Sequence, residues 1–190
     1  MKAFTSAELR DIVIAIIVLA LIFSFPDLTL FLISLVLVFF SYFVHEMGHK
    51  FVARKFGCTA TFKIWPTGIF LGIMTMFFKL IGGWGIVFVA PSFVEIMPYS
   101  FGRWGFKVAR VSKKDLAFIS LAGVGINVLF AVFFKMLPGN IFRRLSYYNG
   151  LIALFNLLPI PPLDGSKIFL WKMWVWLFLI FIAVLTLFVS

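Results

Sequence analysis

The chain has 190 residues, of which 63% are hydrophobic and only 13% are charged, and its mean hydropathy is +1.12. A soluble domain carries roughly 25% charged residues, so this composition excludes a soluble enzyme, a disordered protein and, with a single cysteine, a disulfide scaffold. The net charge of +10 comes from basic residues at the ends of apolar segments, which is typical of contact with a membrane surface and not with nucleic acid.

The apolar segments predict one integral-membrane domain over residues 1–190, with the lipid bilayer as its partner and no nucleic acid. We expect an all-α polytopic bundle of about five to six transmembrane helices. The first span is predicted at residues 12–25, with a signal peptide as the weaker alternative because no cleavage site of small residues follows. The other helical segments are predicted at residues 28–56, 116–137, 141–158 and 163–190.

Residues 59–111 differ from the rest because they are rich in glycine and proline. Thr61–Trp65, Gly85–Ala90 and Phe106–Val111 have the composition of short strands. Ile69–Leu80 is predicted as a re-entrant or interfacial segment, with a complete span as the competing interpretation. Strand edges cannot face lipid, so these strands should lie at the membrane surface or line a cavity walled by protein.

The distribution of basic residues predicts the orientation. Lysine and arginine are frequent between residues 50 and 114, whereas the loop after the first span carries only Asp27. Positive residues favour the cytoplasmic side, so the N-terminus and residues 57–114 are predicted there, in a multi-pass protein of the cell membrane. Arg143 and Arg144 would lie on the opposite side, in conflict with this rule.

The two histidines of the chain, His45 and His49, flank Glu46 in the sequence His-Glu-Met-Gly-His. Residues four apart share one face of a helix, so both imidazoles can point at one ion. Glu46 is turned about 100° from His45 and can reach a water beside that ion. This is the pattern of a zinc hydrolase, with two imidazole ligands and a carboxylate as general base. The predicted site lies toward the cytoplasmic side.

A catalytic zinc site needs a third protein ligand and an open position. No further histidine exists, so the ligand should be a carboxylate, and the candidates are Glu95, Asp115 and Asp164. Asp115 lies in a lysine-rich stretch typical of a surface. Asp164 follows a proline-broken stretch where a carboxylate can be aimed at a metal, although a simple helix cap is an equal interpretation. A gluzincin-type arrangement with Glu95 is the other alternative.

His45-Glu46-x-x-His49 followed by Asn156-x-x-Pro-x-Pro-x-x-Asp164-Gly resembles the site-2 protease family of intramembrane zinc metalloproteases. The resemblance implies one zinc ion per chain, Asp164 as the third ligand and Glu46 as the group that activates water. It also implies that Asn127 lies near the active site and that Asn156 positions substrate. Val124 stands where the family usually has proline, which weakens the match around Asn127.

The resemblance implies a transmembrane protein as substrate, cleaved in regulated intramembrane proteolysis. The strand-like pieces Thr61–Trp65 and Gly85–Ala90 could accept an unwound substrate by β-addition. Other classes remain open: a membrane metal carrier or sensor using the same His/His/Asp site, or a structural subunit whose metal ties helices together. The sequence does not choose an oligomeric state.

Overall fold

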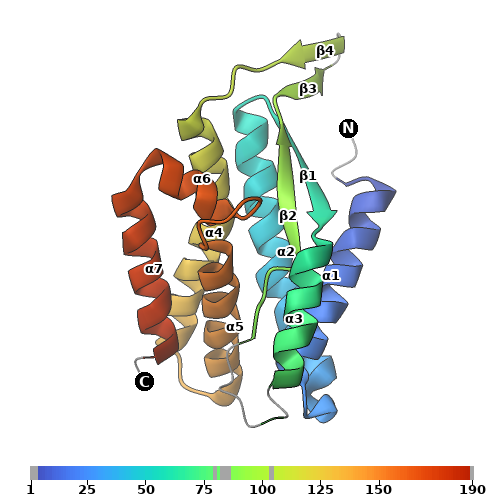
Figure 1. The fold of residues 1–190 in the computed structure, drawn as a ribbon, viewed down its shortest axis with the longest axis vertical. Helices are drawn as coiled ribbons and strands as arrows, with labels where there is room; N and C mark the ends of the chain where they lie inside the picture. The colour runs from blue at the N-terminus through green and yellow to red at the C-terminus, as the bar shows by residue number, and fades with distance from the viewer. Residues whose placement is uncertain (1–3, 79–80, 82–86, 103–104, 189–190) are drawn as a thin grey trace.

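The computed structural model describes residues 4–78, 81, 87–102 and 105–188. The described chain is mostly helical, and its helices run beside one another along the long axis of the molecule (Figure 1). These are α1 (Ser6–Ser24), α2 (Phe31–Lys55), α3 (Pro66–Phe78), α4 (Lys113–Lys135), α5 (Asn140–Asn156), α6 (Asp164–Trp171) and α7 (Met173–Phe188). A short 3-10 helix, η1 (Leu28–Leu30), leads into α2.

Helix α1 begins earlier than the apolar segment predicted at residues 12–25. Thr5 and Glu8 form a capping box, in which the Thr5 side chain accepts from the Glu8 backbone and the Glu8 carboxylate accepts from the Thr5 backbone. This box satisfies free N–H groups of the first turn and fixes the helix start among polar residues. Hydropathy alone could not place that start.

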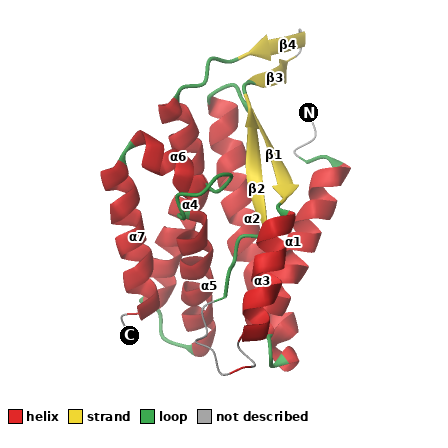
Figure 2. Cartoon of the chain, in the orientation of Figure 1, coloured by secondary structure: helices red, strands yellow, loops and turns green. Residues whose placement is uncertain are grey.

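The strands of the described chain form two separate antiparallel pairs toward one end of the long axis (Figure 2). Strand β1 (Thr59–Ile64) pairs with β2 (Ser92–Met97), from Thr59 opposite Met97 to Ile64 opposite Ser92. Strand β3 (Tyr99–Gly102) pairs with β4 (Gly105–Val108). The predicted strand Thr61–Trp65 overlaps β1, and Phe106–Val111 overlaps β4.

The strand predicted at Gly85–Ala90 is wrong within the described residues. Residues 87–90 are not a strand, residues 85 and 86 lie outside the described residues, and the partner of β1 is Ser92–Met97 instead. The 87–90 segment packs against α3, where Phe88 donates its N–H to the Thr75 hydroxyl at 2.9 Å. A side chain at Gly68 would collide with the carbonyl oxygen of Ala90, so this close approach depends on glycine.

The segment predicted as re-entrant, Ile69–Leu80, lies largely in α3, and its last two residues are outside the described ones. The terminal helix predicted at 163–190 is two helices, because Lys172 adopts an extended backbone (φ −149°, ψ 105°) between α6 and α7. Periodicity did not distinguish a broken helix from a continuous one here.

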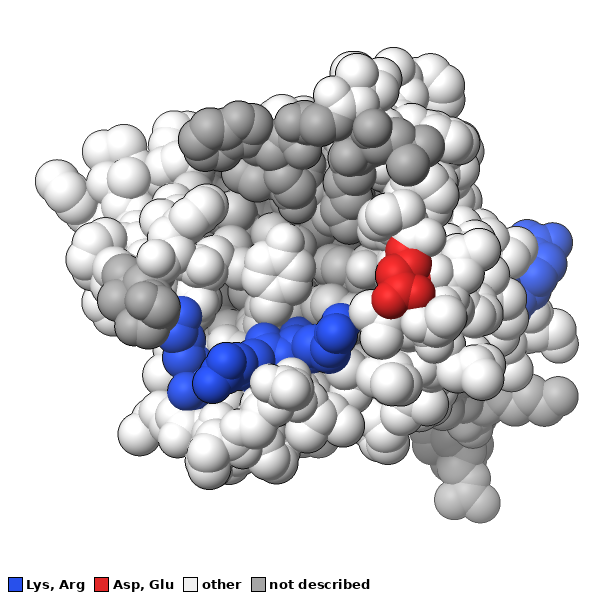
Figure 3. Space-filling model, turned by 90° about the horizontal axis from the view of Figure 1, so that it is seen from below, with Lys and Arg blue, Asp and Glu red and all other residues white. Residues whose placement is uncertain are grey.

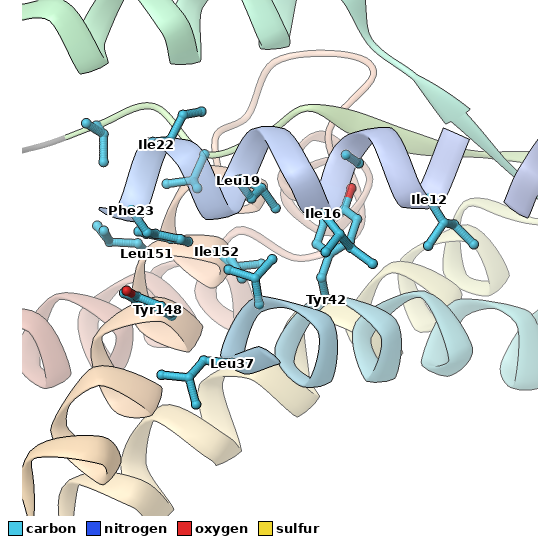
Figure 4. Packing of buried hydrophobic residues seen from close by; sticks show 14 of the residues in the cluster. Ile12, Ile16, Leu19, Ile22, Phe23, Leu37, Tyr42, Tyr148, Leu151 and Ile152 are labelled. Atoms are coloured by element: carbon cyan, nitrogen blue, oxygen red, sulfur yellow. The ribbon is translucent and has the colours of Figure 1, made fainter. Parts of the chain in front are cut away.

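The main hydrophobic core joins α1, α2 and α5 (Figure 4). Leu19 of α1 and Ile152 of α5 are fully buried, and the rings of Phe23 and Tyr148 stack with centroids 4.0 Å apart. A second cluster of buried apolar residues joins α4, α5, α6 and α7. The two clusters together hold α2 and α6, the helices that carry the site described below, in a fixed relation.

Two helical stretches of the described chain, Leu28–Lys55 and Lys113–Lys135, are long and apolar enough to cross a membrane. Helices α3 and α7 are apolar but shorter. Large apolar side chains on these elements are exposed, with Leu32 72% exposed on α2 and Leu129 69% exposed on α4. Exposed apolar surface of this kind is rare on soluble monomers and marks contact with lipid or another protein.

The end of the molecule remote from the strands carries a row of basic side chains and an acidic one (Figure 3). Hydrogen bonds from Thr29, together with the nearby charge of Arg144, hold the pKa of Asp27 below its ordinary value. The negative charge of Asp27 lies near Arg144, one of the two arginines that conflict with the predicted orientation.

Candidate metal centre

His45 and His49 lie on the same face of α2, one helical turn apart, as their spacing predicts. Their Nε2 atoms are 3.0 Å apart, and the two residues are only 2% and 1% exposed. Burying two imidazoles in an apolar bundle costs free energy unless each nitrogen finds a partner. The partners of these nitrogens therefore indicate which ligand the site can hold.

Asp164 is the first residue of α6 and is buried against the two histidines. Its Oδ2 lies 3.0 Å from Nε2 of His49 and 3.6 Å from Nε2 of His45. The N-cap of α6 is Leu163, so Asp164 does not serve as the cap that was its alternative interpretation. Within the described part of the chain, these three residues form a cluster whose ligand atoms all lie within 4.8 Å of one another.

The outer nitrogen of each imidazole already has a hydrogen-bond partner. Nδ1 of His49 faces the carbonyl oxygen of Ile119 at 2.8 Å, and Nδ1 of His45 is hydrogen-bonded to Oδ1 of Asn127. Both partners are acceptors, so in the neutral rings both Nδ1 atoms carry the hydrogen and both Nε2 atoms present lone pairs. Two lone pairs and a carboxylate oxygen thus converge on one point, which is a donor set for a cation.

The distances test whether zinc fits. Tetrahedral zinc with bonds of about 2.0–2.2 Å to nitrogen and oxygen separates its ligand atoms by about 3.3–3.6 Å. The observed separations are 3.0, 3.0 and 3.6 Å. Shifts of a few tenths of an ångström would accommodate the ion, so the residues fit a three-ligand zinc site with an open position.

Glycines allow α4 to approach the metal-binding face of α2. A Cβ atom on Gly123 would collide with the imidazole ring of His49, and one on Gly48 would lie 2.8 Å from the carbonyl oxygen of Ala122. No side chain fits at either contact. A third glycine, Gly165, lies so close to the carbonyl group of Leu157 that a side chain there would overlap it. This contact brings the α5–α6 loop close to the start of α6.

Glu46 is 3% exposed and borders a small pocket shared with the three cluster residues. Its Oε2 is buried and has no hydrogen-bond partner among the described residues. An unpartnered buried carboxylate oxygen is costly and marks a place where another group is expected. Residues of β2, the last residue of α5 and the α5–α6 loop complete the pocket: Ser92, Phe93, Val94, Asn156, Pro162 and Leu163.

The structure separates the two predicted substrate-binding asparagines. Asn156 lines the pocket and donates to the carbonyl oxygen of Ile152 at 2.9 Å. Asn127 lies behind His45, where both hydrogens of its amide are used by protein acceptors, Ser41 and Asn149. Asn127 therefore contacts a candidate ligand and not the pocket, while substrate binding by Asn156 stays a prediction.

The other carboxylate candidates lie elsewhere. Glu95 pairs with Lys63 at 2.6 Å, across the β1–β2 ladder from Thr61. Asp115 forms the capping box of α4 with Ser112. Neither belongs to the cluster of possible ligands, so the gluzincin-type alternative is not supported by the geometry.

Three contributors were missed by sequence reasoning. Ser120 donates to Oδ1 of Asp164 at 2.9 Å, Lys167 approaches the same oxygen at 3.3 Å, and Asn149 binds Asn127. Lys167 stands three residues after Asp164, a spacing that could have suggested the contact. Ser120 and Asn149 carry no motif, and only the packing of α4 and α5 brings them to the site.

Comparison with known proteins adds an independent observation. A protein of Methanocaldococcus jannaschii named "Putative zinc metalloprotease MJ0611" is 33% identical to this chain over 184 residues, covering 91% of this chain and 88% of the relative. No family model matches the chain. No solved structure matches it either.

Proposed function

The chain belongs to the same family as this archaeal protein named as a zinc metalloprotease, and from that premise we propose that it is an intramembrane zinc endopeptidase of the site-2 type. It would cleave membrane-anchored substrates within or near their transmembrane segments. The observation that carries this proposal is the convergence of His45, His49 and Asp164 beside the unpartnered carboxylate of Glu46.

The residues divide into a binding set and a proton carrier. His45, His49 and Asp164 would hold one zinc ion per chain, and Ser120 and Lys167 orient the Asp164 carboxylate through its other oxygen. Zinc, when bound, supplies Lewis-acid chemistry that acidifies water and polarises a peptide carbonyl. Glu46 would take the proton from the attacking water and later deliver it to the departing amine.

Glu46 favours a protease over a metal carrier that uses the same ligands. A metal carrier needs a path of polar groups through the membrane. That interpretation also gives no role to the buried carboxylate of Glu46, whose Oε2 has no partner among the described residues. A hydrolase requires a base that contacts water beside the metal without being a ligand itself. Asn156, which lines the same pocket, would then bind the substrate backbone.

The two strands β1 and β2 suggest how an unwound substrate is held. Trp65 donates its N–H to the carbonyl oxygen of Pro91 at 2.8 Å. Hydrogen-bonded pairs alternate along an antiparallel ladder, so Phe93 and Glu95 also direct their backbone N–H and C=O groups toward β1. In an antiparallel pair the intervening residue, Val94, directs its N–H and C=O to the other side. Val94 also lines the pocket.

The two edges of this sheet differ. On β1 the outward N–H of Phe62 is bonded to the Glu8 carboxylate at 3.2 Å, so that edge is already covered. On β2 no described strand covers the edge beyond Val94. An extended substrate would therefore add to β2, on the side of the metal centre, and its freed backbone groups would gain partners there.

Replacing Val94 by proline tests this arrangement, because proline removes the N–H that the substrate would use. We expect cleavage of a single-span substrate to fall at least tenfold while bound zinc is unchanged. Val94→Ala keeps the N–H and is the matched control, expected near wild-type turnover. Equal cleavage by the proline variant and the wild type would rule out β-addition at β2.

The lipid bilayer and a transmembrane protein substrate are the partners in this proposal, and the site would lie toward the cytoplasmic side. The exposed apolar surface of α2, α4 and α7 and the length of two of these helices support a multi-pass arrangement in the cell membrane. The positive residues between 50 and 114 support the orientation.

The proposed activity is tested with full-length protein in liposomes that contain a single-span substrate and zinc. Glu46→Gln keeps the size of the side chain but cannot accept a proton. We expect this variant to bind zinc as the wild type does and to lose at least a hundredfold in cleavage rate. Cleavage by both proteins at equal rates would remove Glu46 from the chemistry. Zinc transport without cleavage would support the carrier instead.

A further inference from the structure

A series of buried amide groups lies behind His45, on the side away from the pocket. Nδ1 of His45 is hydrogen-bonded to Oδ1 of Asn127, whose Nδ2 donates to the Ser41 carbonyl at 3.1 Å and to Asn149 Oδ1 at 2.7 Å. Nδ2 of Asn149 donates in turn to the Ser41 hydroxyl and the Leu145 carbonyl, both at 2.8 Å. Asn127 and Asn149 are both fully buried.

The far end of this series fixes the direction of every hydrogen bond in it. The backbone carbonyls of Leu145 and Ser41 only accept, so the amide atoms that face them must be N–H donors. Asn149 therefore presents its oxygen to Asn127, and Asn127 presents its oxygen to His45. Because an amide oxygen cannot donate, Nδ1 of His45 must carry a hydrogen, and in the neutral ring Nε2 then presents its lone pair toward Asp164.

Reversing one amide would break several contacts. If the Asn127 amide flipped, its oxygen would face the Ser41 carbonyl and the Asn149 oxygen, and its N–H groups would face an N–H of His45. Asn127 and Asn149 are buried, so each mismatch leaves a buried polar group unsatisfied, which is costly. The arrangement of α2, α4 and α5 thus selects one orientation of Asn127.

We propose that Asn149 and Ser41 are positioning residues that act through Asn127 to hold His45 in its Nδ1–H tautomer, with Nε2 directed at the metal. This inference rests on the metal centre of the proposed function. His49 depends on no side chain for the same purpose, because its Nδ1 faces the backbone carbonyl of Ile119 at 2.8 Å. A side-chain substitution can therefore remove the Nδ1 partner of His45 but not that of His49.

The two histidines make a direct test possible, because ¹⁵N-histidine labelling of the full-length protein gives only two imidazole rings. Nitrogen NMR of the metal-free protein in detergent reports which nitrogen of each ring is protonated. In the wild type we expect Nδ1–H for both rings. In Asn149→Leu we expect the His45 ring to lose this preference and the His49 ring to keep it.

Zinc affinity, measured by competition with a chelator, gives a second readout. Asn127→Leu removes the direct partner of His45 and should weaken zinc binding by about 10- to 100-fold, as loss of a ligand's hydrogen-bond partner generally does. Asn149→Leu should cause a smaller loss in the same direction, and Ser41→Ala the smallest. Asn127→Asp retains an acceptor oxygen for Nδ1 of His45 and should keep the Nδ1–H tautomer, but its second oxygen faces the Ser41 carbonyl and Asn149 Oδ1, so we expect this variant to be less stable than the wild type.

Ser146→Ala is the matched control. The Ser146 hydroxyl is a buried donor on the same helix, α5, and bonds the carbonyl of Ala131 on α4 at 2.7 Å, but it does not reach His45. Removing it deletes an interhelical hydrogen bond of the same kind. We expect the variant to unfold more easily, with both imidazole rings and the zinc affinity unchanged.

The proposal is overturned if Asn149→Leu and Ser41→Ala behave like Ser146→Ala, with an unchanged His45 ring and unchanged zinc affinity. If Asn149→Leu does not fold, Ser41→Ala, which deletes one hydroxyl only, decides the question. These results are separate from proteolysis. A changed His45 ring in a protein that cleaves no substrate would retain the positioning role and reject the protease.

Discussion

Two halves of this molecule differ in whether their functional polar groups already have partners within the protein. In the metal-bearing half, formed by α2, α4, α5 and α6, each candidate ligand is held by a second polar group, as Asp164 is by Ser120. In the strand-bearing half, formed by α1, α3, β1 and β2, one sheet edge is covered by Glu8 while the other presents Val94. A fixed donor set suits a metal, and a strand edge that pairs with no other described strand suits a variable peptide.

The largest effect on stability should come from the buried ion pair that joins the two halves, between Glu8 of α1 and Lys50 of α2. Nζ of Lys50 lies 2.5 Å from Oε1 of Glu8, and both residues are at most 8% exposed. Lys50→Met would leave Glu8 charged, buried and without this partner, and should lower the free energy of unfolding by about 3–5 kcal/mol. Denaturation of the purified protein measures the change.

The double variant Glu8→Gln/Lys50→Met is the control for that experiment. Glutamine brings no charge into the interior and retains one oxygen, which can accept from the N–H of Phe62. It gives up the acceptor of the Thr5 N–H, a loss of about 1 kcal/mol. We therefore expect the double variant to recover most of the lost stability. A double variant as unstable as Lys50→Met would show that packing, and not the unpaired charge, explains the loss.

A smaller effect on stability, but a specific one on the metal, is expected at Gly123. Alanine there would place its Cβ against the imidazole of His49, and the helices must separate or the ring must turn. We expect roughly 1–3 kcal/mol of destabilisation together with loss of zinc binding. Gly125, two residues along α4, has open space where its Cβ would be.

Gly125→Ala therefore controls for the change of glycine in this helix. Alanine is the better helix former by about 0.5–1 kcal/mol, so this variant should be at least as stable as the wild type and bind zinc normally. Zinc binding by Gly123→Ala equal to that of Gly125→Ala would show that the contact with His49 does not position the ligand.

The smallest effect on stability is expected at Asp27, away from the metal centre and from the strands. Its pKa is lowered by hydrogen bonds from Thr29, so the ionised form is favoured in the folded protein. The stability that this provides is present above the ordinary pKa of about 3.9 and is lost as pH falls through the lower, folded value. Asparagine does not titrate, so in Asp27→Asn the melting temperature should fall slightly less between pH 5 and pH 3 than in the wild type. An equal fall in both proteins would contradict the assignment.

The sequence predicted the first part of the metal centre because helical spacing is a local property. His45 and His49 had to share a face once α2 was a helix, and Glu46 had to stand beside them. Asp164 could only be placed among three carboxylates until the resemblance to a family was used. The bend of the chain that brings α6 to α2 depends on contacts such as Gly165 against Leu157, which no local pattern reveals.

The strand-bearing half shows the opposite case. Residues 87–90 have the composition of a strand, but Phe88 bonds the Thr75 hydroxyl of α3, and β1 pairs with the following segment instead. A short apolar run does not specify its partner, because pairing depends on which element lies beside it. The amide series behind His45 was missed for the same reason, since Asn149 and Asn127 come from different helices.

The central claim is that His45, His49 and Asp164 together bind the metal. The most direct test is the zinc content of the purified full-length protein, measured by elemental analysis for the wild type, Glu46→Gln and Asp164→Ala. The account predicts about one zinc per chain in the first two proteins and almost none in the third. Full zinc occupancy in Asp164→Ala, at the same affinity as the wild type, would contradict it.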